Sequence, residues 1–515
     1  MEFALFCTRI NVLILLLSLS SPCKFIQSPM DFGPLNFLQE TKSASLDFGR
    51  IFFSSPSAVL RPQSPKEISQ LLSFVASSSP SSSFSKATVA ARGAGHSIHG
   101  QAQAPNGIVV EMDSLPPSIE IHKKRDGEPG FSYVDVSGGT LWVDLLKESL
   151  QVGLTPRSWT DYLYLTIGGT LSNGGISGQT FKYGPQISNV LQLDVVTGKG
   201  ELVTCSPNQS SELFYAVLGG LGQFGIITSA RIILQDAPQK DQELLVSMAE
   251  MVDYVEGFMV LNEQSLHSSS TAFPSHLDFI PQLDPSRSDV YYCIEFAVHH
   301  HQEKESCVDQ VVEEISRKLS FMPTHIYSVE VSYFDFLNRV RMEEISLRRR
   351  GMWDVHHPWL NMFVPRSGIK QFRDLLLEKI SPSTFVGPIL IYPMLRDKWD
   401  SNTSAVLPEG GPTSENVIYV VGILQSANPR TCQTQCLQTI LAQNRRIVRT
   451  ATYPPIGAKQ YLAHYSEERQ WREHFGGKWE GFVGRKFEFD PLGILAPGQG
   501  IFARKCCKSP SAQIH

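Results

Sequence analysis

The spacing of apolar residues predicts a helix early in the chain. Ile68, Leu71, Leu72 and Val75 recur at intervals of three and four, which places them on one face of a helix. Residues 64–67 (Ser-Pro-Lys-Glu) precede them and combine a capping serine, a proline at the first helical position and a glutamate three residues after the serine. We therefore expect an amphipathic helix that begins with a capping box.

Short β-prone segments and amphipathic segments then alternate up to residue 234, joined by glycine-rich connections. This alternation indicates an α+β domain whose loops face a ligand. Strands are expected at residues 88–91, 107–112, 133–139 and 224–234, a hairpin at 190–206, and helices at 140–154 (capped by Thr140) and 211–220.

The pattern changes near residue 235, where glycines become fewer and amphipathic segments longer, as at 306–322. The Gly- and Pro-rich style of the first part returns in residues 489–502 (FDPLGILAPGQGIF), which suggests that the C-terminus rejoins the first domain. We expect a signal peptide at residues 1–25 and a first domain at 50–235. A second domain is expected at 236–465, and residues 466–505 are expected to return to the first domain.

The N-terminus has the features of a secretory signal. Arg9 precedes an apolar stretch, residues 10–22, that is shorter than the roughly 20 residues needed to span a bilayer, and small residues follow. Cleavage is the interpretation we favour, with an uncleaved signal anchor as the alternative. Asn-X-Ser triplets at Asn208 and Asn402 are candidate glycosylation sites. The expected destination is the extracellular space, with the vacuole as the alternative.

Composition excludes some classes of function. The net charge of -5 argues against a nucleic-acid-binding protein, which would carry a basic surface. Cys432 and Cys436 could form half of a metal site, but no second pair matches them, which favours structural or free thiols. The histidines at 299–301 and 356–357 lack spaced carboxylate or cysteine companions, so we expect no metal site.

Glycine clusters are the clearest functional signal. Residues 92–97 (RGAGHS) follow an expected strand, and two further clusters occupy 166–179 and 219–225. Backbone N–H groups in such loops can hold a dinucleotide pyrophosphate, although neither of the first two segments fits the Rossmann fingerprint. Together the clusters predict a large cofactor lying across them, with His96 at the end of the strand placed to contact it.

Several motifs resemble those of the plant cytokinin dehydrogenases, which belong to the vanillyl-alcohol-oxidase, or PCMH-type, flavoproteins. They occur in order as ARGAGHSIHGQ, SWTDYLYLTIGGTLSNGGISGQTFKYGPQ, GGLGQFGIIT, HPWLNMFVP, GPILIYPM and LAPGQGIF, over nearly all of the chain after the signal. The resemblance implies an α+β fold of two domains: a PCMH-type FAD-binding domain, built from the N-terminal part and the C-terminal tail, and a cytokinin-binding substrate domain.

The resemblance also implies one FAD per chain, bound covalently through the ring of His96 rather than His99. Relatives with a doubly attached flavin use a cysteine in the second glycine segment; residues 160–185 contain none, so a single bond is expected. The residues that match the family's other FAD positions are Ala91, Gly93, Ala94, Gly95, Ser97, Gln101, Asp161, Thr166, Ser172, Ile176, Ile227, Tyr461 and Gln499.

The substrate implied by the family is an adenine with an isoprenoid group on its exocyclic amine, cleaved oxidatively to adenine and an unsaturated aldehyde. Asp161 matches the catalytic aspartate, a sensible base for the amine proton. Glu256 matches a second catalytic carboxylate, which hydrogen-bonds the purine. Without the resemblance, Asp161 would be interpreted as a turn residue and Glu256 as a surface residue. The remaining matches to the substrate slot are Glu343, Trp359, Asn361, Tyr392 and Leu462.

Two alternatives stay open: a flavin oxidase of the same fold acting on a sugar or lactone, and a secreted protein that binds the purine without turnover. The chain is short near residues 234–245, where relatives carry another strand-forming stretch, and this could impair the second domain. The family further implies a monomer, no stable membrane span, and oxygen or a quinone as the electron acceptor.

Overall fold

The computed structural model describes residues 35, 37–38, 41–79, 82–125, 127, 129–238, 252–261, 290–299, 305–319, 329–409, 415–428 and 430–504. The chain divides into two units, Met1–Asn36 and Phe37–His515, and all elements named below belong to the second unit. The expected signal peptide and the short stretch near 239–245 lie outside the described residues.

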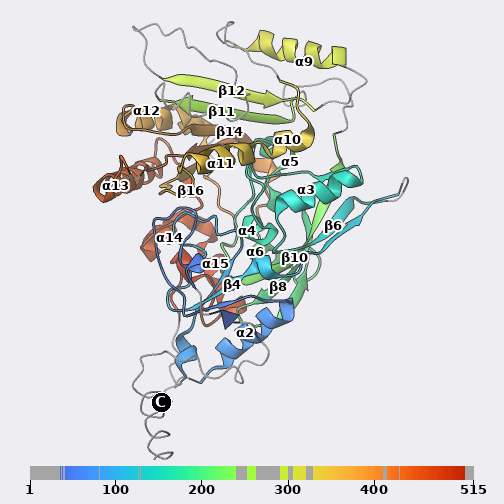
Figure 1. Ribbon diagram of the computed structural model, residues 1–515, viewed down its shortest axis with the longest axis vertical. Coiled ribbons are helices and arrows are strands. Elements are labelled where there is room, and N and C mark those ends of the chain that lie inside the picture. The colour runs from blue at the N-terminus through green and yellow to red at the C-terminus, as the bar shows by residue number, and fades with distance from the viewer. Residues whose placement is uncertain are drawn as a thin grey trace, which may run out of the picture. The chain divides into compact units, whose positions relative to one another are not determined.

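Two sheets form the first part of the chain (Figure 1). The first has the order β1-β2-β4-β3, with β2 and β3 both parallel to β4, and the second has the order β5-β6-β10-β8-β9, with β7 paired to β10. Their strands are β1 (Phe37–Leu38), β2 (Ala58–Leu60), β3 (Val89–Arg92), β4 (Ile108–Glu111), β5 (Ile119–His122), β6 (Ser132–Ser137), β7 (Leu154–Pro156), β8 (Val190–Thr197), β9 (Leu202–Cys205) and β10 (Gly225–Asp236).

A third, antiparallel sheet has the order β12-β11-β14-β15-β13-β16. Alternate residues of its strands enter different cores. Phe363 and Tyr392 pack with the core of the second sheet, whereas Met362 and Val364 pack with Phe372 of helix α12 (Ile369–Lys379). The strands are β11 (Tyr254–Val260), β12 (Tyr291–Ala297), β13 (Leu360–Pro365), β14 (Ile389–Leu395), β15 (Val417–Ile423) and β16 (Lys459–Tyr461).

The predicted helices and the hairpin of β8 and β9 are confirmed, and so is the α+β class. The helices are α2 (Pro65–Ser77), α3 (Trp142–Gln151), α4 (Ile167–Leu171), α5 (Thr180–Tyr183), α6 (Ser211–Val217), α9 (Glu305–Lys318), α10 (Tyr333–Leu337), α11 (Arg339–Arg349), α12 (Ile369–Lys379), α13 (Thr434–Ala451), α14 (Glu468–Phe475) and α15 (Trp479–Phe489). Among the described residues, none of these helices is long and apolar enough to cross a bilayer.

Both predicted helix caps are wrong in detail. The Ser64 side chain does not cap α2, and Glu67 Oε2 accepts the N–H of Gln63 instead, at 3.1 Å. Helix α3 begins at Trp142 without a bond from Thr140, because the N–H groups of its first turn reach carbonyls of another segment. Trp142 N–H donates to Leu165 O, for example, at 3.0 Å. A tertiary contact thus replaces the local cap of α3, whereas α2 keeps a local bond of a different kind.

The C-terminal segment returns to the first sheet. Val89 N–H donates to Ile494 O at 2.8 Å, and Ala496 N–H donates to Val89 O at 3.0 Å, so the tail runs beside β3. Residues separated by about 400 positions are thereby neighbours. The N-terminal region and the C-terminal tail thus form one part of the fold, as the resemblance implied for the first domain.

Candidate active site

One large cavity, of about 1020 Å³, collects residues from all three sheets and from the C-terminal tail. This volume is at the upper end for small-molecule and cofactor sites, which measure roughly 300–1,000 Å³. Segments after β3, around α4 and before β10 line one wall, which we call the glycine wall. Residues of β11, α11, β13, β14 and β16 line the other wall together with Asp161, and we call this the sheet wall.

Every expected cofactor residue lines this cavity, and the glycine wall shows why glycine is needed. A Cβ on Gly93 would lie 2.0 Å from Thr166 Oγ1, so the main chain of the first glycine loop lies directly against the Thr166 side chain, just before α4. Gly95 has φ +66°, a conformation that L side chains rarely adopt. The second glycine segment is not wholly a loop as expected, because its first residues form the short helix α4.

His96 lies in a stack of rings. Its imidazole faces Phe48 at a centroid distance of 3.9 Å and Tyr162 at 5.0 Å, and Phe48 stacks on His357 on its other side. Burial, with a smaller effect of His357, lowers the pKa of His96 to about 3. The ring is therefore neutral at physiological pH and keeps one nitrogen lone pair available.

His99 has a different environment from His96. It is not among the described residues that line the cavity, and its ring stacks on His464 at 4.8 Å. Of the two histidines in the loop, only His96 faces the cavity that would hold a cofactor.

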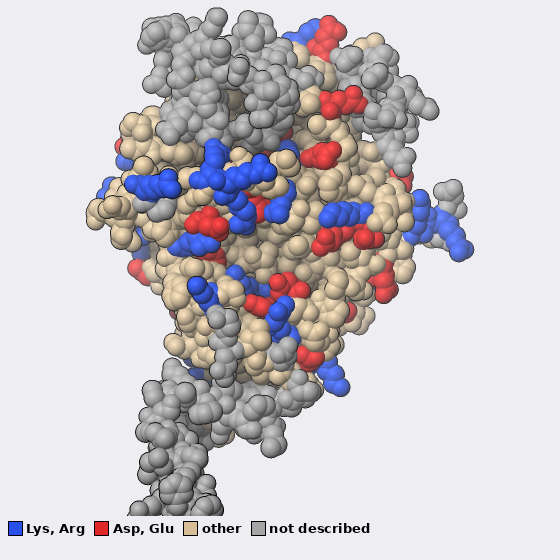
Figure 2. All heavy atoms as spheres, in the orientation of Figure 1, with Lys and Arg blue, Asp and Glu red and all other residues tan. Residues whose placement is uncertain are grey.

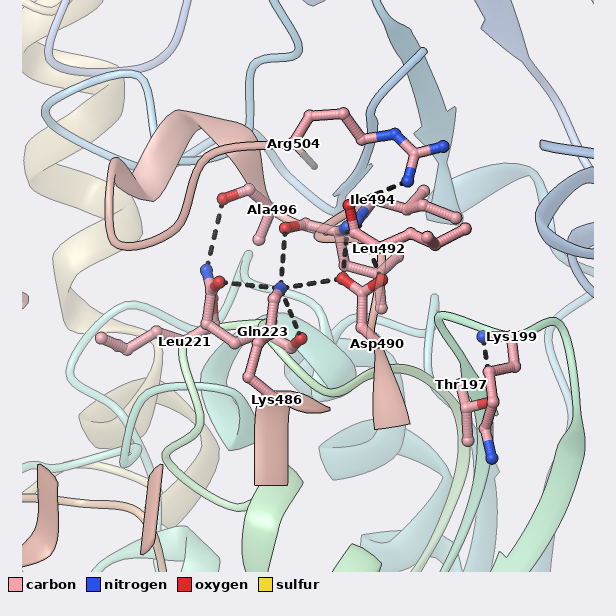
Figure 3. Close-up of polar contacts among 11 residues, drawn as sticks. Thr197, Lys199, Leu221, Gln223, Lys486, Asp490, Leu492, Ile494, Ala496 and Arg504 are labelled. Atoms are coloured by element: carbon pink, nitrogen blue, oxygen red, sulfur yellow. Dashed lines mark hydrogen bonds and ion pairs between the residues drawn. The ribbon is translucent and has the colours of Figure 1, made fainter. Parts of the chain in front are cut away.

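The buried ion pair of Lys486 and Asp490 supports the glycine wall from outside the cavity (Figure 3). Lys486 Nζ lies 2.8 Å from Asp490 Oδ2 and donates to Gln223 O at 2.9 Å. Gln223 Nε2 in turn donates to Ala496 O at 3.3 Å. Because Ala496 and Leu221, the residue two before Gln223, both line the cavity, this pair ties the C-terminal tail to the third glycine cluster.

The sheet wall carries a buried charge cluster that the sequence did not indicate as a unit. Tyr254 Oη donates to Asp161 Oδ1 at 3.2 Å and is also hydrogen-bonded to Glu256 Oε2. Arg339 from α11 pairs with Glu256 at 3.1 Å and with Glu295 at 3.6 Å. Glu256 is only 5% exposed, so the interpretation as a surface residue is excluded.

Burial dominates the ionisation of these acids. It raises the pKa of Asp161 to about 6, against the opposing effects of Arg339 and the Tyr254 hydroxyl. It raises the pKa of Glu256 to about 8, and the nearby Asp161 carboxylate adds to that shift. Asp161 is therefore the stronger acid of the two and is mostly ionised at neutral pH, which suits a general base.

The expected substrate residues all line the same cavity. Trp359 Nε1 is a buried donor with no partner among the described residues, and burial raises the pKa of Glu343 to about 7. Arg350 also lines the cavity and is exposed, at the end of α11, where Figure 2 shows Lys and Arg gathered on the surface. The cavity contacts solvent near positive charge.

Sequence reasoning missed a second group of charges beside His96. Tyr162 Oη donates to Glu344 Oε2 at 2.6 Å, and Arg341 and Arg348 both pair with this carboxylate, which is 1% exposed. The pKa of Glu344 is lowered because these hydrogen bonds outweigh its burial. The i, i+3 and i, i+4 spacing of Arg341, Glu344 and Arg348 was the available signal.

The candidate metal residues have other partners. His357 uses both ring nitrogens, on Ser426 Oγ at 3.0 Å and Trp353 O at 2.8 Å. Cys432 and Cys436 form a disulfide at the start of α13, so they are not free thiols. Within the described residues, no three His, Cys, Asp or Glu side chains are grouped as metal ligands would be.

Comparison with known proteins assigns the family. The family described as "Cytokinin dehydrogenase 1, FAD and cytokinin binding" matches residues 230–502, and an FAD binding domain matches residues 56–206. Cytokinin dehydrogenase 3 of Oryza sativa subsp. japonica is 64% identical over 530 residues and covers 99% of each chain. The chain belongs to the cytokinin dehydrogenase family. It is accordingly a flavin-dependent oxidoreductase whose cofactor is FAD and whose substrate is a cytokinin.

Further relatives agree with this assignment. Cytokinin dehydrogenase 8 of Oryza sativa subsp. indica is 56% identical, covering 95% of this chain and 97% of its own. Cytokinin dehydrogenase 1 of Arabidopsis thaliana is 43% identical, covering 94% and 84%. The solved structure of 6-hydroxy-D-nicotine oxidase from Arthrobacter nicotinovorans superposes with a TM-score of 0.61, at 16% identity and over 90% and 96% of the two chains, which shows a shared fold.

The residues that line the cavity are themselves suited to FAD. Gly93, Ala94 and Gly95 line the cavity, and the main-chain N–H groups of such a loop can contact a phosphate. Gln499 Oε1 is buried, lines the cavity and has no hydrogen-bond partner among the described residues. An acceptor of this kind requires a donor, which a nucleotide can supply.

Proposed function

We propose that this protein oxidises the amine side chain of N6-isoprenoid adenines and thereby cleaves it, giving adenine and an unsaturated aldehyde. The observation that carries the proposal is Asp161: a half-buried, ionised carboxylate in the cavity, beside the glycine wall. Bound FAD supplies the acceptor for the hydride that leaves the carbon next to the amine. Asp161 takes the amine proton as the hydride leaves, and water then hydrolyses the resulting substrate imine.

The sheet wall would orient the purine. Glu256 holds its proton at neutral pH and can donate it to a ring nitrogen, while Trp359 Nε1 offers a second donor. Asn361, Tyr392 and Leu462 line the rest of this wall. Most of the wall is apolar or aromatic, which suits an isoprenoid chain better than a sugar.

Anaerobic addition of isopentenyladenine tests this proposal. We expect the yellow flavin absorbance to bleach and adenine to be released once an acceptor, oxygen or a quinone, is supplied. Bleaching by sugars alone would favour the alternative oxidase, and binding without bleaching would favour a purine carrier. Either result would overturn the proposal.

We propose further that the single FAD of each chain is bound covalently through His96. The support is its neutral ring in the cavity, against the position of His99 outside it. In acid-precipitated protein, His96→Ala should release its flavin into the supernatant. The matched variant His99→Ala should keep flavin with the pellet, and the opposite pattern would assign the bond to His99.

Secretion, glycosylation and a monomeric state remain proposals that rest on the sequence. The side chains of Asn208 and Asn402 are both exposed, as an attached glycan requires. We expect a fluorescent fusion to accumulate in the extracellular space, with the vacuole as the alternative, and N-glycosidase to reduce the mass of the purified protein. An unchanged mass would contradict glycosylation at both positions.

A further inference from the structure

Tyr254 occupies a central position between the two acids of the site. Its side chain is 1% exposed, and its hydroxyl is within hydrogen-bond reach of Asp161 Oδ1, Glu256 Oε2 and Arg339. A phenol has one hydrogen to donate, and Arg339 can only donate. The hydroxyl therefore accepts from Arg339 and directs its own hydrogen to a carboxylate.

Packing holds Tyr254 in this position from two sides. A Cβ on Gly178 would lie 2.5 Å from the Tyr254 ring, so the end of the second glycine segment lies directly against the ring. Phe336 meets the same ring edge-on at 5.1 Å, and the Arg339 guanidinium lies 4.6 Å from each of the two ring centroids. The tyrosine therefore has little freedom to turn its hydroxyl away.

The charge count explains why this arrangement matters. Glu256 is buried, Asp161 and Glu295 are half-buried, and the three acids share one arginine, so full ionisation would leave two uncompensated charges. The cluster must retain protons, and a proton on Asp161 would disable it as a base. The donors around Asp161 decide which acid stays ionised.

We propose that Tyr254 and Arg339 are positioning residues for the reaction: Arg339 fixes the Tyr254 hydroxyl between the two carboxylates, and that hydroxyl keeps Asp161 ionised and correctly oriented. This inference rests on the proposed role of Asp161 as the base. Burial raises the pKa of Tyr254 well above its ordinary value, so the phenol stays protonated and remains a donor. The titratable and charged groups that face Asp161 or Arg339 are Tyr254, Glu256, Glu295, Glu343, Tyr392 and Tyr461.

The test is the pH dependence of flavin reduction in Tyr254→Phe. Loss of the hydrogen bond removes an influence that lowers the pKa of Asp161, so the acid limb of the rate profile should move to higher pH by about 0.5 to 1 unit. The loss of rate relative to the wild type should be largest on the acid limb and smallest at the high-pH plateau, where Asp161 is ionised in both proteins. An unshifted limb would overturn the inference.

Tyr333→Phe is the matched control. Tyr333 is partly buried, and its hydroxyl bonds to Thr155 and Trp159 outside the cavity. Its removal should leave the acid limb unchanged, so a shift here equal to that of Tyr254→Phe would also overturn the inference. Arg339→Lys keeps the charge but not the forked geometry, and should shift the limb in the same direction as Tyr254→Phe.

A second readout needs no substrate. Infrared difference spectra recorded while the oxidised holoenzyme is titrated should show the C=O band of a carboxylic acid. The titration midpoint of this band should lie at higher pH in Tyr254→Phe, and the band should be missing in Asp161→Asn. If Asp161→Asn still reduced its flavin at the wild-type rate, the proposed role of Asp161 as the base would fail. If only the Tyr254→Phe shift were absent, the base would stand and the positioning role alone would be rejected.

Discussion

The two walls of the cavity use opposite means to hold small molecules. The glycine wall is formed largely by main chain: a Cβ on Gly93 would collide with Thr166, and Gly95 needs a left-handed backbone. On the sheet wall, ionised and hydrogen-bonded side chains such as Asp161, Glu256 and Arg339 meet in a buried cluster. The glycine wall depends on close packing of the main chain, and the sheet wall depends on interactions between charged and hydrogen-bonded side chains.

The difference teaches which part of the site resists substitution and which part responds to pH. Backbone contacts are set by the fold and do not titrate, so the glycine wall should bind its ligand similarly across pH. Buried acids change charge with pH, so the sheet wall should control the pH dependence of both rate and stability. The following predictions separate the two walls, beginning with the largest effect.

Asp161→Asn should act on the sheet wall alone. The rate of flavin reduction by isopentenyladenine should fall by about 10²- to 10⁴-fold, because the amide cannot take the amine proton. Flavin content should stay at the wild-type level, because the glycine wall is intact. Rapid-mixing absorbance measures the rate, and Asp144→Asn on the exposed face of α3 is the control. Undiminished bleaching would remove Asp161 from the role of base.

Lys486→Met should weaken the glycine wall from behind. It leaves Asp490, which is 0% exposed, with two backbone N–H donors but without its charge partner, and breaking a buried pair costs about 3–5 kcal/mol of unfolding free energy. Denaturant unfolding measures this loss. The exposed pair of Glu314 and Lys318 gives the scale, since Lys318→Met should cost far less than Lys486→Met. Equal losses in the two variants would contradict the assignment of Lys486 as an anchor.

Gly93→Ala should lower flavin content by crowding Thr166. Overpacking of this kind costs about 1–3 kcal/mol, and here the strain falls on residues that line the cavity. The double variant Gly93→Ala/Thr166→Ala removes Thr166 Oγ1 and should recover part of the lost flavin. Flavin absorbance per protein measures both. Failure of the double variant to recover any flavin would argue against this contact as the cause.

Glu256→Gln should change the pH dependence of stability. The pKa of Glu256 is about 8 in the folded protein, above its ordinary value of 4.5, so its contribution to stability is complete below pH 4.5 and is lost as pH rises through 8. Glutamine does not titrate. Relative to the wild type, the variant should therefore gain unfolding free energy from pH 5 to pH 8, as measured by denaturant unfolding. Parallel pH curves would contradict this.

Much of the glycine wall was visible in the sequence. Glycine clusters, the strand that leads into His96 and the return of a Gly/Pro style at 489–502 are local patterns, and by themselves they predict a cofactor site. Motif resemblance then supplied Asp161 and Glu256, which composition alone would have interpreted as a turn residue and a surface residue. Both line the cavity.

Only the tertiary structure assembled the groups that act on those residues. Tyr254 and Glu295 lie on β-strands and Arg339 on a helix, and no local pattern marks their meeting. The predicted cap of α3 failed for the same reason, since Leu165 O serves α3 from another segment. Periodicity and local backbone conformation depend on residues that are close together in the sequence. The burial that raises a pKa, and the partner that opposes it, come from residues brought together only by folding.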